Sequence, residues 1–339
     1  MRARLSILIG LALPALACAA PVHEGVRSKG GAPIDTQTLF QIGSVTKGFL
    51  STTMAIAVDR GKFHWDDRVV DLDPGFQMRD PWVTREFRFF DLLAQRSGLP
   101  PYANDEFGAL DFDRSTLIRS LRYVEPVSSF RTTFAYTNIT HILAGRIVAK
   151  AEGAADWNAV LQTDILDPLG MKDSTYSAAA ITSAANHAQG YRYTADGSIE
   201  VPFEDFTYNY DGAGDINSNI EDMGKWVGLQ LASGTTRDGK RIVSAESLAY
   251  THTPKVAISD KASYALGWVV QQTPNGSIVQ HNGGTHGFGS MVIPSARSQA
   301  WRRRPHQPSE CRHAGRDRPV DHRPSPRQPD GRLRGDSPC

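Results

Sequence analysis

Apolar residues recur at helical spacing near the start of the chain. Between residues 41 and 61 they are Phe49, Leu50, Met54, Ala57 and Val58. Residues three or four positions apart share one face of a helix, so the pattern predicts a helix over Gln41–Gly61. Gly61 stands where a helix would end, because glycine readily adopts the left-handed conformation of a C-terminal cap.

Helical patterns also predominate from about residue 85 to residue 235. The main candidates are Phe87–Ala94, Ile139–Ala151 and Ile220–Leu231, with turn-rich sequence such as Ser97–Tyr102 between them. This spacing predicts a mainly helical subdomain.

The period changes to that of strands near residue 264. Tyr264–Gln272, Ser277–His281 and Gly287–Ile293 predict three consecutive strands, the first two joined by a hairpin turn at residues 274–276. Helices followed by an antiparallel meander predict an α+β sandwich, in which helices flank an antiparallel sheet beside a mainly helical subdomain.

The first twenty residues have the pattern of an export signal. Arg2 and Arg4 precede the apolar run Leu5–Leu16, and small residues follow. We therefore expect a signal peptide over residues 1–20 and a secreted or periplasmic protein. Lipidation at Cys18 is the alternative.

Composition and charge narrow the class of protein. The 339 residues are 40% hydrophobic and 22% charged, enough for a domain with a buried core over residues 21–296. Residues 20–296 carry 24 Lys plus Arg against 31 Asp plus Glu, which argues against a nucleic-acid surface. No run of eighteen apolar residues predicts a membrane-spanning helix. The oligomeric state stays open.

Residues 297–339 differ in composition from the rest of the chain. They contain eleven Arg and seven Pro and few large apolar residues, which predicts a disordered tail. If the arginines are encoded by CGN codons, reading Trp301–Gln307 one nucleotide later allows Gly-Val-Val-Val-Leu-Thr-Asn, a strand-like run. We interpret the tail as out of frame. The alternatives are a genuine basic tail and a nucleic-acid or envelope adhesin.

Several common catalytic classes are excluded by missing motifs. The cysteines are Cys18, Cys311 and Cys339, so residues 30–295 offer neither a disulfide nor a thiol nucleophile. The chain has no Gly-x-Ser-x-Gly, no His-Glu-x-x-His and no glycine-rich phosphate loop. The pair His281 and His286 is a poor metal site, and we expect neither a metal nor a cofactor.

Ser44 and Lys47 form the only Ser-x-x-Lys of the chain. Three residues apart on a helix, their side chains share a face, so the amine can reach the hydroxyl. A desolvated lysine with a lowered pKa can take the proton of a serine and make it a nucleophile. The alternative is an N-cap serine beside a solvated lysine.

Two further elements contain residues suited to catalysis. Tyr136 and Asn138, in Tyr-Thr-Asn, could move a proton and bind a substrate amide, or be a half-buried aromatic and a helix cap. Tyr102-Ala103-Asn104 has the same pattern. In His281-Asn-Gly283-Gly284-Thr, the glycines would let a substrate lie against a strand edge. The alternative for His281 is a locally bonded imidazole.

Together and in this order, the motifs resemble those of the serine β-lactamase and penicillin-recognising hydrolase family, in particular its class C-like branch with DD-carboxypeptidases, D-aminopeptidases and esterases. The resemblance runs from about Thr38 to Pro294. It rests on Ser44-Val-Thr-Lys47, Arg96-Ser-Gly-Leu-Pro100, Tyr136-Thr-Asn138, Pro168-Leu-Gly-Met171 and His281-Asn-Gly283.

The resemblance implies a role for each site residue. It implies that Ser44 is the acylated nucleophile and that Lys47 and Tyr136 accept and return the Ser44 proton. It also implies that Asn138 binds the substrate amide. The backbone N–H groups of Ser44 and Gly284 would form the oxyanion hole, with Gly283 beside them.

The chain departs from the family pattern in two places. His281 stands where class C β-lactamases carry the Lys of Lys-Thr-Gly, which favours the peptidase and esterase side. Only about two dozen residues separate Ala20 from Ser44, where family members usually have a helix and two strands. We therefore expect a sheet that is incomplete at its N-terminal and C-terminal sides.

These residues predict a secreted serine acyl hydrolase that acts on β-lactam or D-amino-acid amide or ester bonds of a small-molecule or peptide substrate. The alternative is an inactive or penicillin-binding-only product of a truncated, frameshifted gene. The sequence does not choose between lactam, peptide and ester.

Overall fold

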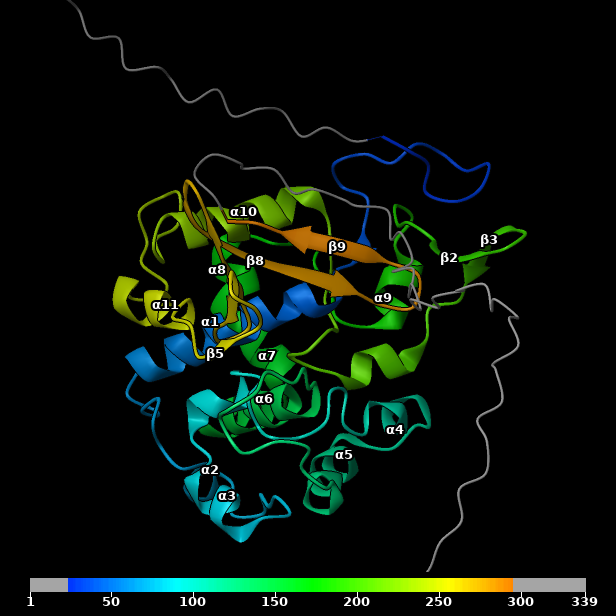
Figure 1. Ribbon diagram of the computed structural model, residues 1–339. Coiled ribbons are helices and arrows are strands. Elements are labelled where there is room, and N and C mark those ends of the chain that lie inside the picture. Colours follow the sequence, from blue (N-terminus) through cyan, green and yellow to red (C-terminus); the bar gives the residue numbers. More distant parts are fainter. Residues whose placement is uncertain (1–23, 295–339) are drawn as a thin grey trace, which may run out of the picture. The chain divides into compact units, whose positions relative to one another are not determined.

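A computed structural model describes residues 24–294 of the chain as a mixture of helices and antiparallel strands (Figure 1). The α-helices are α1 (Thr46–Asp59), α2 (Val69–Leu72), α3 (Pro81–Glu86), α4 (Asp105–Ala109), α5 (Arg114–Ser120), α6 (Ile139–Glu152), α7 (Trp157–Leu161), α8 (Asp167–Leu169), α9 (Ala178–Ser183), α10 (Ile220–Leu231) and α11 (Ala245–Thr251). The predicted signal peptide 1–20 and the predicted tail 297–339 lie outside the described residues.

The strands are β1 (Phe40–Gln41), β2 (Gly190–Thr194), β3 (Gly197–Val201), β4 (Asn217–Ser218), β5 (Val256–Ala257), β6 (Ala262–Tyr264), β7 (Val269–Thr273), β8 (Gly276–Gly284) and β9 (Gly289–Val292). Short 3-10 turns are η1 (Gly43–Val45), η2 (Phe89–Leu92), η3 (Leu121–Tyr123) and η5 (Asp205–Asn209), and a π-helical turn, η4 (Gln162–Leu166), links α7 to α8. The predicted α+β class is confirmed.

Helix α1 lies in the middle of the described residues, with the β8–β9 end of the sheet on one side and α6 and α7 on the other (Figure 1). Its residues from Thr46 to Ala57 are all buried. The helix ends as predicted, because Gly61 at φ +69° lets its own N–H bond to Val58 O and that of Lys62 bond to Ala57 O. It begins later than predicted, since Phe40–Gln41 pairs with β4 as strand β1.

The main sheet has the order β5-β6-β7-β8-β9, with every neighbouring pair antiparallel. The predicted hairpin is present, because Thr273 pairs with Gly276 across two loop residues. The predicted single strand Tyr264–Gln272 is wrong. The chain turns between β6 and β7, where Gly267 has φ +76° and a Cβ on it would lie 2.6 Å from Lys47 O. Close packing against α1 therefore imposes a turn that strand propensity alone does not predict.

The two halves of strand β8 pair with different neighbouring strands. Residues 276–280 pair with β7, whereas residues 281–284 pair with β9. The second half of β8 therefore runs past the end of β7 and lies beside η1, the turn that precedes α1. This offset brings the His281–Gly284 segment to the start of the central helix.

Only some of the helices predicted between residues 85 and 235 are present in the structure. The predictions of Ile139–Ala151 and Ile220–Leu231 are confirmed as α6 and α10. The predicted helix Phe87–Ala94 is wrong, since only the turn η2 forms there. The Asp91 carboxylate accepts a bond from Arg88 N–H and ion pairs from two arginines, which fixes a short turn instead of a helix. The β2–β3 hairpin was not predicted.

Aromatic stacking joins α1, α10 and the sheet in one core. Phe49 stacks on Trp226 with ring centroids 4.0 Å apart, and Trp226 stacks on Trp268 at 5.5 Å. Gly48 makes the approach possible, because a Cβ there would lie 2.8 Å from both tryptophan rings. The packing therefore fixes the position of α1, and with it the side chains at its start.

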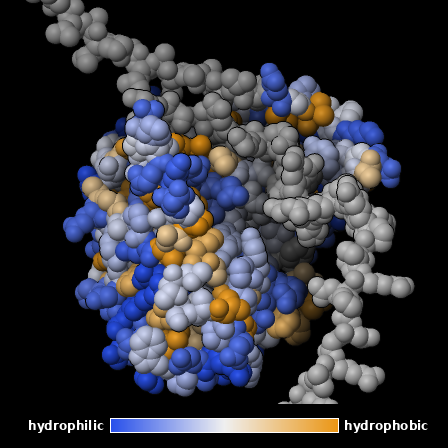
Figure 2. All heavy atoms as spheres, in the orientation of Figure 1, coloured by the Kyte–Doolittle hydropathy of each residue, from blue (hydrophilic) through white to orange (hydrophobic). Residues whose placement is uncertain are grey.

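The surface face in Figure 2 mixes hydrophilic and hydrophobic residues. Among residues 24–294, no helix is long and apolar enough to cross a membrane.

Candidate active site

Ser44 and Lys47 lie together at the start of the central helix, as predicted. Ser44 belongs to η1 and Lys47 to the first turn of α1. The Lys47 Nζ atom lies 3.0 Å from Ser44 Oγ. Lys47 is fully buried, whereas Ser44 is partly exposed. A buried amine in contact with an accessible hydroxyl is the arrangement that a serine nucleophile needs.

The other two contacts of the Lys47 amine determine where its lone pair points. Nζ lies 2.7 Å from Asn138 Oδ1 and 2.7 Å from Ala213 O, two oxygens that only accept hydrogen bonds. A neutral amine has two N–H groups and one lone pair. If both N–H groups bond to these carbonyls, the lone pair faces the Ser44 hydroxyl. The site thus holds Lys47 in the orientation of a base toward Ser44.

Burial also brings the pKa of Lys47 into the physiological range. Desolvation lowers the Lys47 pKa from 10.5 to about 7, against the charges of Asp105 and Asp215, which raise it. A substantial fraction of the amine is therefore neutral at pH 7. The predicted desolvated lysine is present in this structure.

Tyr136 lies over the same amine. Its ring centroid is 4.8 Å from Lys47 Nζ, and it contacts the Ser44 hydroxyl. Burial raises the pKa of Tyr136 above its usual value of 10 far more than the Ser44 contact lowers it. The phenol therefore keeps its proton at neutral pH and can donate it to a neighbouring atom. Tyr102 packs beside Tyr136, with ring centroids 5.5 Å apart.

Asn138 bridges two charged groups through its carboxamide. Its Oδ1 accepts from Lys47, while its Nδ2 donates to Asp105 Oδ2 at 2.5 Å. Asn138 is the residue before α6, but its side chain makes no capping bond. The alternative interpretation as a helix cap is therefore wrong for its side chain.

Asp105 is a site residue that the sequence did not predict. It begins the short helix α4, and burial raises its pKa from 3.8 to about 6. Its Oδ1 atom is buried and has no hydrogen-bond partner among the described residues. Asp105 directly follows Tyr102-Ala103-Asn104, the second copy of the Tyr-x-Asn pattern, and this adjacency was the only signal in the sequence.

Glycines let the end of β8 touch the turn that carries Ser44. A Cβ on Gly43 would lie 2.8 Å from Gly284 N, and one on Gly283 would lie 1.9 Å from Ile42 O. Gly43 has φ +51°. Only glycine fits at Gly43 and Gly283, so the two backbones approach directly, as expected for this segment.

The Gly284 N–H points away from β9. Thr285 N–H donates to Phe288 O at 3.0 Å, and Gly284 pairs with Gly289. In an antiparallel pair, this pattern makes Gly284–Gly289 a pair without mutual hydrogen bonds. The Gly284 N–H therefore lies on the side of Gly43 and not on the side of β9.

His281 is close to the other site residues but is buried behind them. Its ring centroid lies 6.4 Å from that of Tyr136. Its Nδ1 lies 2.6 Å from Asn282 O, which only accepts, so Nδ1 carries the proton and Nε2 accepts from the Tyr264 hydroxyl at 2.9 Å. Burial lowers the His281 pKa from 6.5 to about 3, so the ring is neutral at pH 7.

A second set of buried acids lies near the amine and was also not predicted. Asp211 and Asp215 flank the turn that carries Ala213 O. Burial raises the pKa of Asp215 to about 8 and that of Asp211 to about 6. Arg114 pairs with Asp211 at 3.2 Å. In the sequence, these acids lie in a glycine-rich stretch that predicts only a loop, so nothing marked them as site residues.

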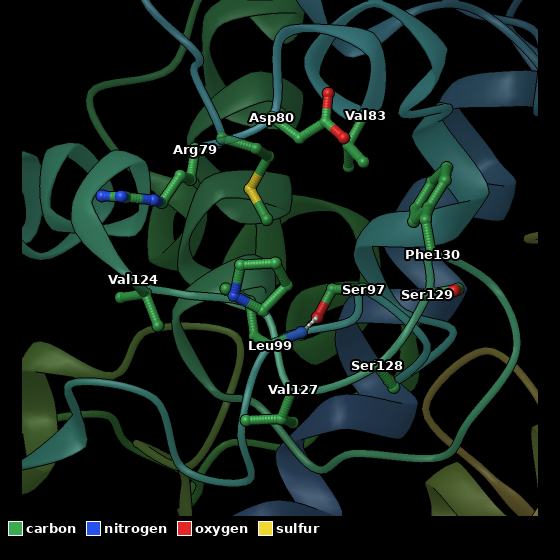
Figure 3. A pocket seen from close by; sticks show the side chains of 12 residues that line it. Arg79, Asp80, Val83, Ser97, Leu99, Val124, Val127, Ser128, Ser129 and Phe130 are labelled. Carbon is green, nitrogen blue, oxygen red and sulfur yellow. Dashed lines mark hydrogen bonds between the residues drawn. The ribbon is translucent and has the colours of Figure 1, made fainter. Parts of the chain in front are cut away.

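A separate pocket of about 410 Å³ lies at Ser97 and Leu99, below the Arg79–Asp80 segment (Figure 3). It contains none of the predicted site residues. Within residues 24–294, no three His, Cys, Asp or Glu side chains gather as ligands of a metal ion would.

Comparison with known proteins gives one family. The family model described as Beta-lactamase matches residues 10–298. The chain is 32% identical to unguisins hydrolase ungD′ of Aspergillus campestris, over 77% of this chain and 51% of that protein. It is 26% identical to a beta-lactamase of Escherichia coli, over 77% of this chain and 73% of that protein.

Solved structures agree in fold. The octameric penicillin-binding protein homologue from Pyrococcus abyssi superposes with a TM-score of 0.68 at 22% identity, over 80% of this chain and 63% of that one. A D-stereospecific amidohydrolase from Streptomyces sp. gives 0.64 at 22% identity, over 76% and 78%. The chain spans about half the length of the first curated relatives that it matches.

Proposed function

The chain belongs to the beta-lactamase family, and we propose that it hydrolyses acyl bonds through an ester formed on Ser44. One observation carries the proposal: the buried Lys47 amine lies 3.0 Å from Ser44 Oγ, while its other two contacts are acceptor oxygens. These contacts leave the amine lone pair for the serine proton.

In the first half-reaction, Ser44 Oγ attacks the carbonyl carbon of the substrate, and its proton moves to neutral Lys47. The developing oxyanion accepts from the backbone N–H groups of Ser44 and Gly284. When the tetrahedral intermediate collapses, the bond to the leaving group breaks. The leaving nitrogen or oxygen takes the proton from Lys47, directly or through Tyr136.

In the second half-reaction, water attacks the ester carbonyl and gives up a proton to the same basic group. The acid product leaves and Ser44 regains its proton. Tyr136 keeps its proton at neutral pH, so in both halves it can donate a hydrogen bond and relay a proton by taking one up as it gives one away, with Lys47 as the base.

His281 bears on the substrate class. A neutral imidazole cannot serve as a fixed positive charge for a substrate carboxylate, and His281 stays neutral at pH 7 because its pKa is about 3. This supports amide or ester substrates over carboxylate-bearing β-lactams.

The test is covalent labelling of the full chain by a fluorophosphonate and by a labelled penicillin, with peptide mapping of the adduct. We expect both labels on Ser44 and none on the Ser44→Ala variant. Labelling of Ser44→Ala at the wild-type rate would refute the proposal. Turnover is then measured with a chromogenic cephalosporin and with ester and amide substrates. Turnover supports a hydrolase, whereas penicillin labelling without turnover of any of these substrates supports a penicillin-binding protein instead.

Residues 1–20 lie outside the described residues, and we propose export of the chain on their sequence pattern alone. Expression in a bacterial host followed by cell fractionation tests this. Retention of the full-length chain in the cytoplasm would contradict it.

A further inference from the structure

A chain of hydrogen-bonded side chains runs from the protein interior to the backbone around Ser44. Its members are Thr285 after β8, Gln41 in β1, Tyr208 in η5 and Asn217 in β4. Thr285 Oγ1 lies 2.7 Å from Gln41 Oε1. The Tyr208 hydroxyl lies 2.9 Å from Gln41 Nε2 and 2.9 Å from Asn217 Oδ1. Gln41, Tyr208 and Asn217 are buried, and the proposed reaction does not use them.

The donor and acceptor roles along this chain are fixed from its inner end. Asn217 Nδ2 lies 3.2 Å from Ser177 O, which only accepts, so the Asn217 side-chain carbonyl faces Tyr208. The Tyr208 hydroxyl therefore donates to Asn217 and accepts from Gln41 Nε2. The Gln41 carbonyl then faces Thr285, whose hydroxyl donates to it. Because the members depend on one another, removal of one hydroxyl leaves buried polar groups unpaired on both sides of it.

The outer end of the chain joins the two segments that carry the proposed oxyanion donors. Thr285 directly follows Gly284, and Gln41 lies three positions before Ser44. The bond between Thr285 and Gln41 therefore ties the end of β8 to the turn that begins α1.

Contact between glycine backbones sets only one limit on the spacing of these segments. At Gly43 and Gly283 the two backbones touch, so they cannot come closer, but this contact does not stop them from moving apart. Hydrogen bonds across the gap supply that second limit. One is the bond from Ser290 Oγ to Ile42 O at 2.6 Å, and the other is the bond from Thr285 to Gln41. The second bond is continued into the interior by Tyr208 and Asn217.

We propose that Thr285, Gln41 and Tyr208 are positioning residues that set the distance between the two N–H groups of the oxyanion hole. The inference rests on the proposed function, in which the N–H groups of Ser44 and Gly284 hold the oxyanion. Such donors act only at hydrogen-bond distance from the place where the negative charge develops. A wider spacing therefore weakens binding of the transition state more than binding of the substrate.

The first variant breaks the chain in its middle. Tyr208→Phe removes one hydroxyl, two hydrogen bonds away from Thr285. Fluorophosphonate labelling of Ser44 is measured against probe concentration, which gives the maximal rate constant and the half-saturating concentration separately. We expect the rate constant to fall about 5- to 50-fold, because misplaced oxyanion donors lose much of their effect. The half-saturating concentration should stay within about threefold, since it reports binding before reaction.

A second set of variants tests the outer end of the chain. Thr285→Val keeps the shape of the side chain without the hydroxyl and should cause a loss like that of Tyr208→Phe. Thr285→Ser keeps the hydroxyl and should restore the rate constant to within about twofold of wild type. The double variant Thr285→Val/Tyr208→Phe should lose little more than either single variant, because the chain is already broken. Independent structural damage would instead multiply the two losses.

Tyr191→Phe is the matched control. It removes a tyrosine hydroxyl that bonds to Glu200 on the β2–β3 hairpin, and it should leave the labelling rate constant within about twofold of wild type.

The outcomes separate the failure of this inference from the failure of the proposed function. If wild-type Ser44 is labelled but Tyr208→Phe or Thr285→Val keeps the rate constant within twofold, the positioning role is overturned and the serine hydrolase stands. Losses that multiply in the double variant overturn the positioning role as well. If Ser44 of the wild-type chain is not labelled, the proposed function itself fails.

Discussion

The two sides of Ser44 differ in chemistry, with polar side chains on one side and glycine backbone on the other. On the α1 side, polar side chains surround Lys47, and its pKa is near 7. On the β8 side, the Gly43, Gly283 and Gly284 backbones pack directly on one another, and the nearest titratable ring, His281, stays neutral. Both Lys47 and His281 are buried, yet only Lys47 changes charge near neutral pH.

The difference comes from what each buried group contacts. Lys47 has two carbonyl acceptors and lies near negative charge, so desolvation does not drive its pKa far below 7. His281 has one acceptor and one donor, which satisfy the neutral ring fully. In the proposed mechanism, proton transfer therefore takes place on the α1 side, while the β8 side supplies shape and backbone donors.

The largest expected effect is loss of the base on the α1 side. Lys47→Ala should slow acylation of Ser44 by about 10² to 10⁴-fold, because general base catalysis contributes on that order. The measurement is the second-order rate of fluorophosphonate labelling. Lys62→Ala, which removes an exposed lysine that pairs with Glu152, is the control and should label at the wild-type rate. A Lys47→Ala rate within tenfold of wild type would mean that another group takes the proton.

On the β8 side, alanine substitution at two adjacent glycines should have very different effects on stability. Gly283→Ala should destabilise the fold by about 3 kcal/mol or more, since its Cβ would lie 1.9 Å from Ile42 O and 2.5 Å from Ser290 Oγ. Gly284→Ala has nothing within 4 Å of the added Cβ and should change stability by about 0.5 kcal/mol or less. Urea denaturation measures both. Equal stability of the two variants would contradict the direct backbone contact.

A smaller effect is expected behind the β8 side. Tyr264→Phe removes the donor to His281 Nε2 and leaves a buried acceptor unpaired, which costs about 1 to 3 kcal/mol. Adding His281→Phe to this variant should recover part of the loss, because no polar atom is then left unpaired. A double-mutant cycle in urea measures the coupling. Strict additivity would contradict the hydrogen bond between the two side chains.

The smallest expected effect is a displacement of the pH profile. Labelling should rise with pH as Lys47 loses its proton, with half of the maximal rate near its pKa of about 7. The negative charge of Asp105 raises the Lys47 pKa, so Asp105→Asn should move the half-maximal point to lower pH. His281→Gln should leave the profile between pH 5 and 9 in place. A shift to higher pH in Asp105→Asn would contradict the statement that the Asp105 charge raises the Lys47 pKa.

The sequence predicted the site residues whose relation is local or carried by a motif. Ser44 and Lys47 lie three positions apart, so helical geometry alone brings them together. Asn138 follows Tyr136 at the start of a clearly periodic helix. The prediction of α6 and α10 succeeded for the same reason, since their apolar residues recur over many positions.

The missed features depend on contacts between distant segments. Strand β6 ends because Gly267 packs against the Lys47 backbone, more than two hundred positions away. Asp105 looked like part of a turn, and its place beside Asn138 depends on the bond from Tyr102 N–H to Tyr136 O. No local pattern encodes such contacts, because either segment alone has no preference for the conformation that the other imposes.

The offset of β8 has a consequence for how the protein acquires its activity. Ser290 Oγ bonds to Ile42 O across 248 positions of the chain, and Lys47 bonds to Ala213 O across 166. Closing such long loops is entropically costly and comes late in folding. An emerging or half-folded chain would therefore have its serine and lysine but neither the lowered Lys47 pKa nor the Gly284 N–H of the proposed oxyanion hole. If Ser44 reacts as proposed, its labelling reports completed folding and counts correctly folded molecules during refolding.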